Sequence, residues 1–409
     1  MLGIVLALLF VLSCVPFTSQ ASSWTTVVVD SGGGAPGPFA MTSLALDANG
    51  AVHISYKTDN YPGGESIKYA TNSGGTWSVS TIEQIQFAGM RIGPSATVDE
   101  SGSPHVVYSN GTEVKHAWLS SGTWENETLA SDVLAYAIDS AFDSAGHLHA
   151  CYIRTNRSGI VNLTCADQTP SGWNSTVIVT NQSIDSISML VDNQGKTCVC
   201  FTGLASVGVL SLFYAEQAGG VKAVSEVYPH ADMADMAVDS KGDRHIAFID
   251  STGNASHLMY ISSHNGTWQT STLTTIDNQA CWDPSIAIDS EDRVYVSYTA
   301  SGGALDLLRC AVKTNDGWKK QTIDRTSSSD SGFFLSPSIA VDSAGTAHIS
   351  YWKGWGNPAG HVGGLMYASG IVSTEESVVV IAGVVVLVAV SIFGVVFVIT
   401  RRRKARGIS

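Results

Sequence analysis

Apolar and polar residues alternate along most of the chain in short runs separated by Gly, Asp, Asn and Ser. Alternation with a period of two is typical of β-strands that bury one face. One order of segments returns seven times: an apolar run, an aspartate, a tight turn and a second apolar run, as in "IAVDSAGTAHISY". The spacing is 44 to 53 residues, and the aspartates are Asp47, Asp99, Asp143, Asp192, Asp239, Asp289 and Asp342.

Each unit continues with a third apolar run and then with a glycine-flanked tryptophan segment such as "GGTWSVSTI". Four strands in a period of 40 to 50 residues are the signature of a β-propeller blade. We therefore predict an all-β, seven-bladed propeller over residues 22–370. The seventh unit lacks its fourth strand, so we expect "SSWTTVVVD" around Trp24 to supply it and close the ring, which removes an open sheet edge.

Both ends of the chain carry long apolar segments. Residues 1–21 have the apolar core and the small-x-small end, Ser19 and Ala21, of a signal peptide; lipid attachment at Cys14 is the alternative. After a spacer at 371–377, the uncharged run 378–399 is long enough to cross a hydrocarbon core of about 30 Å, and a basic tail follows at 400–409. A buried core helix is the alternative for that run. We predict a single-pass protein of the cell membrane, with the ectodomain outside and the tail in the cytoplasm.

The charge balance narrows the choice of partners. Five of the 22 basic residues lie in the tail, so 35 acidic residues of the ectodomain face 17 basic ones, a net charge of −18. Such a surface repels polyanions, which excludes nucleic acid. Glycosylation is expected at eight Asn-x-Ser/Thr sites: Asn110, Asn126, Asn156, Asn162, Asn174, Asn181, Asn254 and Asn265.

The predicted ectodomain has six cysteines, which allow either disulfides or buried free thiols. Cys198 and Cys200 lie two apart in one predicted strand and point to the same side, which is poor geometry for a bond between them. Their partners, if any, are not determined by the sequence.

The repeat resembles those of secreted bacterial and archaeal β-propellers of the sialidase-like (BNR/Asp-box-type) group. The likeness rests on "PSIAVDSAGTAHISY" and on the Gly-x-Trp turn, and it implies the propeller fold without fixing an activity. A standard Asp-box reads Ser-x-Asp-x-Gly-x-Thr-Trp. The nearest segment here, residues 70–77, keeps Gly74, Thr76 and Trp77 but has Ala70 and Asn72 in place of the serine and the aspartate.

A histidine follows the repeated aspartate by six residues in five units. A catalytic group is needed once, whereas a residue present in most blades serves what the blades share, so we expect the pair to hold the turn and its next strand. The alternative is a catalytic Asp-His pair. The structural pairs are Asp47 with His53, Asp99 with His105, Asp143 with His149, Asp239 with His245, and Asp342 with His348.

A second repeated position lies four residues before each aspartate, at the predicted start of the innermost strand near the channel mouth. Small residues there fit a crowded axis; alternatively, their oxygens hold water or a divalent cation such as Ca²⁺. No other cofactor is expected, and no metal ligands are assigned. This ring comprises Ser43, Ser95, Asp139, Ser188, Asp235, Ser285 and Ser338.

The connections between units vary in length and sequence and are expected to meet on one face of the propeller. Aromatic rings beside polar groups suit saccharide or peptide binding, although such rings also pack within their own loops. The ligand-binding candidates on this variable-loop face are Tyr61, Phe87, Arg91, Asp232, Trp282, Asp283, Phe333, Phe334, Trp352, Trp355 and His361.

The predicted function is recognition or adhesion at the cell surface, through a glycan, a surface polymer or an envelope or extracellular protein. No nucleophile elbow, phosphate loop or zinc motif occurs, and the loop arginines Arg91, Arg154, Arg157 and Arg325 form no evident sialidase triad. A carbohydrate-active hydrolase or lyase on the same face is the alternative, and a structural envelope protein is a third. The catalytic residues of such an enzyme are not identifiable from the sequence.

Overall fold

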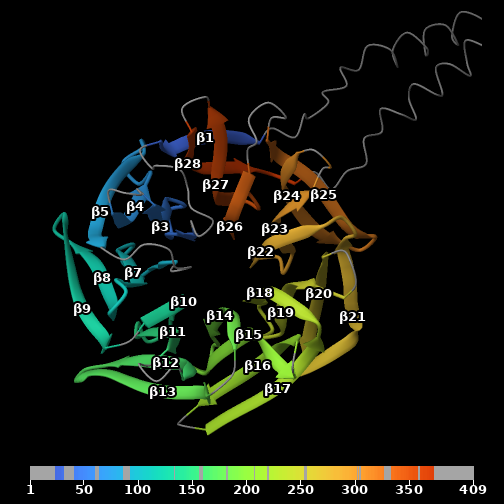
Figure 1. Cartoon of the computed structure of the whole chain (residues 1–409), viewed down its shortest axis with the longest axis horizontal. Helices are drawn as coiled ribbons and strands as arrows, with labels where there is room; N and C mark the ends of the chain where they lie inside the picture. Colours follow the sequence, from blue (N-terminus) through green and yellow to red (C-terminus); the bar gives the residue numbers. More distant parts are fainter. Residues whose placement is uncertain are drawn as a thin grey trace, which may run out of the picture. The chain divides into compact units, whose positions relative to one another are not determined.

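A computed structural model describes residues 24–31, 41–59, 64–85, 93–132, 134–155, 160–180, 183–206, 208–218, 221–252, 256–301, 303, 305–326, 333–357 and 360–372. These residues form 28 strands in seven four-stranded antiparallel sheets, and no helix occurs among them. The sheets stand around a common centre as the blades of a propeller (Figure 1). The predicted all-β, seven-bladed fold is confirmed.

Each blade runs from an innermost strand to an outermost one in chain order. Blades 1 and 2 comprise β2 (Thr42–Leu46), β3 (Val52–Asp59), β4 (Glu65–Thr71), β5 (Ser78–Ile85), β6 (Ser95–Val98), β7 (Pro104–Ser109), β8 (Glu113–Ser120) and β9 (Thr123–Ser131). Blades 3 and 4 comprise β10 (Leu134–Phe142), β11 (Leu148–Thr155), β12 (Val161–Thr169), β13 (Gly172–Thr180), β14 (Ile184–Val191), β15 (Thr197–Ser206), β16 (Val209–Ala218) and β17 (Val221–Pro229).

Blades 5 and 6 comprise β18 (Ala231–Val238), β19 (Arg244–Asp250), β20 (His257–His264), β21 (Thr267–Asp277), β22 (Cys281–Ile288), β23 (Val294–Ser301), β24 (Asp306–Thr314) and β25 (Gly317–Arg325). Blade 7 combines both ends of the described chain: β26 (Phe333–Val341), β27 (Ala347–Asn357), β28 (Gly360–Gly370) and, outermost, β1 (Thr25–Asp30). β1 runs antiparallel to β28, from Thr25 opposite Ser369 to Asp30 opposite Leu365.

The chain divides into two compact units, Met1–Val372 and Ser373–Ser409. The second unit contains the expected membrane segment and basic tail, and all of it lies outside the described residues, as do the signal peptide and Asn156, Asn181 and Asn254. Within the described part of the chain, no helix is long and apolar enough to cross a membrane.

The hydrophobic core lies between the faces of neighbouring blades. Ile249 and Tyr260 of blade 5, for example, pack against Ile286, Val296 and Tyr298 of blade 6. The two middle strands of a blade are the most buried, because both of their faces meet another sheet, whereas an outermost strand such as β5 is largely exposed. Each of the seven junctions between neighbouring blades buries an apolar cluster of this kind.

The repeated aspartate organises the same turn in every blade. Its Oδ1 accepts the backbone N–H groups two and four residues later, at 2.8–3.0 Å, in all seven copies. In the last copy the turn is completed by Gly345 at φ 78°, a conformation that glycine adopts without strain. The acceptor and the glycine together explain why Asp-x-x-Gly recurs in the sequence.

The repeated histidine bridges that turn to the third strand. His348 places Nε2 at 3.4 Å from Asp342 Oδ2 and Nδ1 at 2.6 Å from the Tyr367 hydroxyl. The other four histidines occupy the same place, with Tyr69, His116, Asp167 and Tyr260 as their third-strand partners. The Asp-His pair is thus part of the framework of each blade that carries it.

Several expected loops are strands instead. The segment after Trp352 forms a long hairpin, because β27 continues to Asn357 and β28 begins at Gly360. The link from blade 4 to blade 5 is the single residue His230, between β17 and β18. Innermost strands gain length through β-bulges that the period-two pattern does not reveal, such as the one in β10 after Tyr136.

One expected glycosylation site is wrong for this fold. Asn162 lies in β12, is 9% exposed and has neighbouring strands on both sides, so its amide cannot accept a bulky glycan without unfolding of the blade. Asn110 is half-buried and donates its side-chain N–H to Glu83 at 3.2 Å. The Asn-x-Ser/Thr residues that the structure exposes are Asn126, Asn174 and Asn265.

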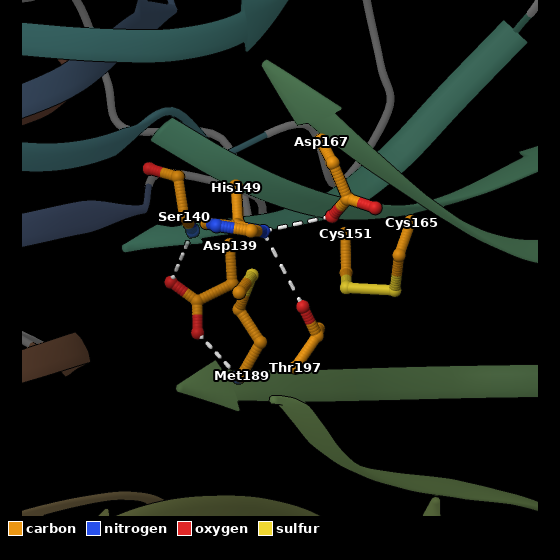
Figure 2. Close-up of a disulfide and its surroundings, with 8 residues drawn as sticks. All are labelled: Asp139, Ser140, His149, Cys151, Cys165, Asp167, Met189 and Thr197. Carbon is orange, nitrogen blue, oxygen red and sulfur yellow. Dashed lines mark hydrogen bonds and ion pairs between the residues drawn. A yellow bond between two sulfur atoms is a disulfide. The ribbon is translucent and has the colours of Figure 1, made fainter. Parts of the chain in front are cut away.

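Blade 3 contains a disulfide between Cys151 and Cys165, which lie directly opposite each other on β11 and β12 (Figure 2). Cys198, Cys200, Cys281 and Cys310 are buried free thiols. Burial raises the pKa of the Cys310 thiol and that of the Cys281 thiol, the latter to about 12. These thiols are therefore protonated and unreactive at neutral pH in the folded protein.

Candidate functional site

A cavity of about 470 Å³ lies where the innermost strands of all seven blades begin. Its lining comes from residues 41–43, 93–95, 136–139, 185–187, 233–235, 283–285 and 336–338. We call it the channel cavity. It is the place where the predicted serine and aspartate ring meets the links between blades.

The ring residues form a continuous chain of bonds around this cavity. Each side-chain oxygen accepts the backbone N–H of the residue that follows the ring position in the next blade, at 2.7–3.3 Å. Ser338 of blade 7 binds Leu44 of blade 1 in this way, so the bonds run through all seven blades. A serine hydroxyl is sufficient for this contact, which accounts for the small residues at the axis.

Two ring positions hold a carboxylate instead. Asp139 accepts the N–H of Met189 at 2.7 Å with one oxygen, and the N–H of Ser140 at 2.9 Å with the other (Figure 2). Asp235 makes the equivalent bonds to Ile286 and Met236. Burial raises the pKa of Asp139 to about 7, with the Asp235 carboxylate adding to the effect, and burial likewise raises the pKa of Asp235.

In four blades the backbone is strained at the residue two positions before the ring residue. Ala137, Met233, Asp283 and Ser336 adopt φ of 44° to 51° although none is a glycine. Strain of this kind tends to occur at functional sites, where bulges redirect side chains. Here Asp283 lines the cavity and accepts the N–H of Ser336 at 3.1 Å, which fixes its carboxylate at the rim.

The cavity is acidic. Asp139, Asp185, Asp235 and Asp283 line it, and no Lys, Arg or His occurs among its described lining residues. Asp185 is exposed, whereas the other three are half-buried. Across the described residues, no group of three or more His, Cys, Asp or Glu side chains is arranged to hold a metal ion. The arrangement places Asp139, which can carry a proton near neutral pH, in the same cavity lining as three further carboxyl groups.

The ligand-binding candidates separate in the structure. Tyr61, Phe87 and Arg91 lie outside the described residues, and so do the side chains of Trp355 and His361. Of the rest, Asp283 lines the channel cavity, whereas Asp232, Trp282 and Phe333 are half-buried at the start of their strands and are not among its lining residues.

Contrary to the expectation from the sequence, Phe334 and Trp352 do not lie on an exposed loop surface. Both are fully buried: Phe334 packs edge-on against Tyr351, and Trp352 packs edge-on against Tyr56 of blade 1. They lie on strands rather than loops, so their rings fill the contact between blades and are not available to a ligand at the surface.

A set of polar contacts between blades was not predicted from the sequence. At four junctions an acid at the end of an outermost strand accepts the hydroxyl of a second-strand tyrosine and a nearby lysine or arginine. The clusters are Asp30 with Tyr56 and Lys68, Glu83 with Tyr108 and Lys115, Asp277 with Tyr298 and Arg309, and Asp324 with Tyr351 and Lys353. The signal was present as the tyrosine that ends "HISY" and the acid that ends the tryptophan strand.

Comparison with known proteins shows the fold. No family model matches the chain, and no curated protein matches it. The structure is similar to an ulvan lyase solved with -[GlcA(1-4)Rha3S]- bound (TM-score 0.60, 10% identity, 83% of this chain and 95% of the other). It is also similar to a protein of unknown function from Dyadobacter fermentans (TM-score 0.52, 11% identity, 85% and 98%) and to a Hadza microbial sialidase (TM-score 0.45, 12%, 81% and 65%). At these identities the likeness concerns the fold alone, and the ulvan lyase structure is among those that share the fold of this chain.

Proposed function

We propose that the protein is a carbohydrate-active propeller and that the channel cavity is its saccharide site. The observation that carries the proposal is the cavity itself: it has a volume of about 470 Å³, within the usual range for a ligand site, and four carboxyl groups line it, one of them with a pKa raised to about 7. The shared fold with a saccharide-bound lyase supports the ligand class.

The carboxyl groups that line the channel cavity are suited to hydrolysis of a glycosidic bond. Such hydrolysis commonly uses one carboxylic acid to protonate the leaving oxygen and one carboxylate as base or nucleophile. Asp139, whose pKa is raised to about 7, suits the acid, and Asp283 at the rim suits the carboxylate. A lyase acting on a uronate commonly uses a cationic group to neutralise the substrate carboxylate, and no Lys, Arg or His occurs among the described lining residues.

Activity on a panel of neutral and acidic polysaccharides tests this proposal. Released reducing ends without absorbance from an unsaturated product would support hydrolysis. Asp139→Asn should reduce kcat by a factor of at least about 100, since it removes general acid catalysis, while KM stays similar. The exposed Asp316→Asn is the matched control. Turnover that is unchanged in Asp139→Asn would reject Asp139 as the acid.

Recognition without turnover, the function predicted from the sequence, is the second candidate. Saccharide retained by the protein with no product would support it, because the same cavity can bind without catalysing. If no saccharide is bound or cleaved, but an envelope protein co-purifies with the chain, a structural role is favoured.

We further propose that the propeller is exported and displayed outside the cell on the C-terminal apolar segment, with β1 closing the ring. The apolar runs at both ends of the sequence support this. Proteolysis of intact cells is the test: removal of the propeller by an added protease is expected, and full protection would reject it. A cation in the channel cavity, such as Ca²⁺, remains a proposal that titration calorimetry on chelator-treated protein tests.

A further inference from the structure

A second cavity, of about 420 Å³, lies at the junction of blades 5 and 6. It is lined by Asp277 and Gln279, at and just after the end of β21, and by Arg309, Lys320 and Thr322 on β24 and β25. None of these residues lines the channel cavity. We call it the junction pocket.

The single carboxylate in the junction pocket is already well supplied with donors. Asp277 accepts the Tyr298 hydroxyl at 2.9 Å and Arg309 Nη1 at 2.6 Å with one oxygen. The other oxygen lies 3.3 Å from Lys320 Nζ and accepts the N–H of Gln279 at 3.2 Å. Although burial alone would raise it, these groups hold the pKa of Asp277 below its usual value, so its charge is −1 at neutral pH.

The charges in this pocket do not balance. Arg309 and Lys320 supply two positive charges against the one negative charge of Asp277. The three equivalent clusters at other junctions each pair one lysine with one carboxylate: Lys68 with Asp30, Lys115 with Glu83, and Lys353 with Asp324. One lysine is therefore sufficient for the contact between blades, and the contact at blade 6 does not require the added charge.

The free donors are placed to receive a ligand. The contact with Asp277 occupies one guanidinium nitrogen of Arg309, and the guanidinium carries five N–H donors in a planar fork that matches an oxyanion. Thr322 lies directly opposite Arg309 on the neighbouring strand, which puts its hydroxyl on the same face. The Lys320 side chain is 37% exposed, so its ammonium can turn toward an incoming anion.

We propose that the junction pocket is a binding site for an oxyanion, a carboxylate or a sulfate group, presented by a ligand at this junction. Arg309 and Lys320 neutralise the anion, while Thr322 and Gln279 donate hydrogen bonds to it. In a protein of net charge −13 this pocket would be a local site of attraction for an anionic group. The inference does not depend on the channel cavity acting on saccharides.

The test is isothermal titration of the intact chain with sodium glucuronate, sodium sulfate and, as a neutral probe, glucose, all at constant ionic strength. Saturable one-site binding of glucuronate or sulfate but not of glucose is expected, and the preference between the two identifies a carboxylate or a sulfate site. Lys320→Gln should weaken binding about tenfold, since a charge-assisted contact is lost. Thr322→Val should weaken it less.

Lys319→Gln is the matched control, because it removes the same charge from the adjacent position of β25 and Lys319 does not line the pocket. It should bind as the wild type does. Absence of saturable binding of both anions would overturn the proposal. Equal affinity in Lys320→Gln and wild type, or glucose binding with the same affinity as glucuronate, would also overturn it.

Discussion

Asp342 illustrates how much one repeated side chain supports. Its Oδ1 accepts the N–H groups of Ala344 and Thr346, and its Oδ2 faces His348. We expect Asp342→Ala to lower the free energy of unfolding by about 1–3 kcal/mol, because two backbone donors in the turn lose their acceptor. Chemical denaturation measures this, with the exposed Asp316→Ala as a control that should change little. Equal effects of the two substitutions would contradict the role given to the turn.

The raised pKa of Asp139 predicts how the stability of the folded protein changes with pH. Burial raises the pKa of this carboxyl to about 7 from an ordinary value of 3.8. Between those two pH values the folded state binds more protons than the unfolded state, so the contribution to stability is complete below pH 3.8 and falls as the pH rises toward 7. Asp139→Asn cannot titrate. Chemical denaturation at pH 4, 5.5 and 7 should therefore show that the free energy of unfolding of the variant increases relative to that of the wild type as pH rises. A difference that stays constant with pH would contradict the raised pKa.

Individual residues were the least predictable part of the chain from sequence. Phe334 and Trp352 each lie two residues from a glycine, which is typical of loops, yet both are fully buried because a β-bulge and a long hairpin extend the strands through them. The tyrosine of "HISY" was interpreted as an apolar strand residue. Its hydroxyl in fact reaches an acid about 25 residues away, at the end of the preceding blade, and alternation along one strand contains no information on such a contact.

At the level of elements, we expect β1 to stabilise blade 7 through its pairing with β28. Its ladder to β28 covers the edge of blade 7, and Trp24 lies so close to Gly370 that an added methyl group there would lie 2.7 Å from the indole. A chain that begins at residue 32 loses the ladder and this packing. We expect its Tm to fall by at least about 5 °C relative to a chain that begins at residue 22.

Differential scanning calorimetry of the two chains makes that comparison. Equal melting would contradict a stabilising role for β1. A Tm restored by adding the strand as a separate peptide would separate loss of pairing from misfolding of the shortened chain.

Strand existence was predictable because alternation of apolar and polar residues survives in every blade, whereas strand length was not. The bulges in β10, β18, β22 and β26 each insert residues that interrupt the period of two, so the start of each of these strands resembled a loop in the sequence. These are the positions that bring Asp283 and the strained backbone to the channel cavity.

At the scale of the whole molecule, seven aspartates at a nearly constant spacing and four predicted strands in each unit were together enough to predict the propeller. The ring position was also visible, but its bonding was not, because each oxygen is used by a different blade from the one that carries it. The two cavities could not be predicted, since each collects residues from segments far apart in the sequence.

The ring of side-chain oxygens has a direction, and amide hydrogen exchange can detect it. Removing one hydroxyl leaves the blade that carries it intact and frees an amide in the following blade. Ser338→Ala should therefore speed exchange at Leu44, which is 294 positions away in the sequence, and leave Ile339 beside the substitution as protected as before. Faster exchange at Ile339 with no change at Leu44 would contradict this. If Leu44 responds as expected, the loss of a ring oxygen acts on the following blade and not on its own. The direction is the same at every junction: from each blade to the next in chain order, and from the seventh to the first.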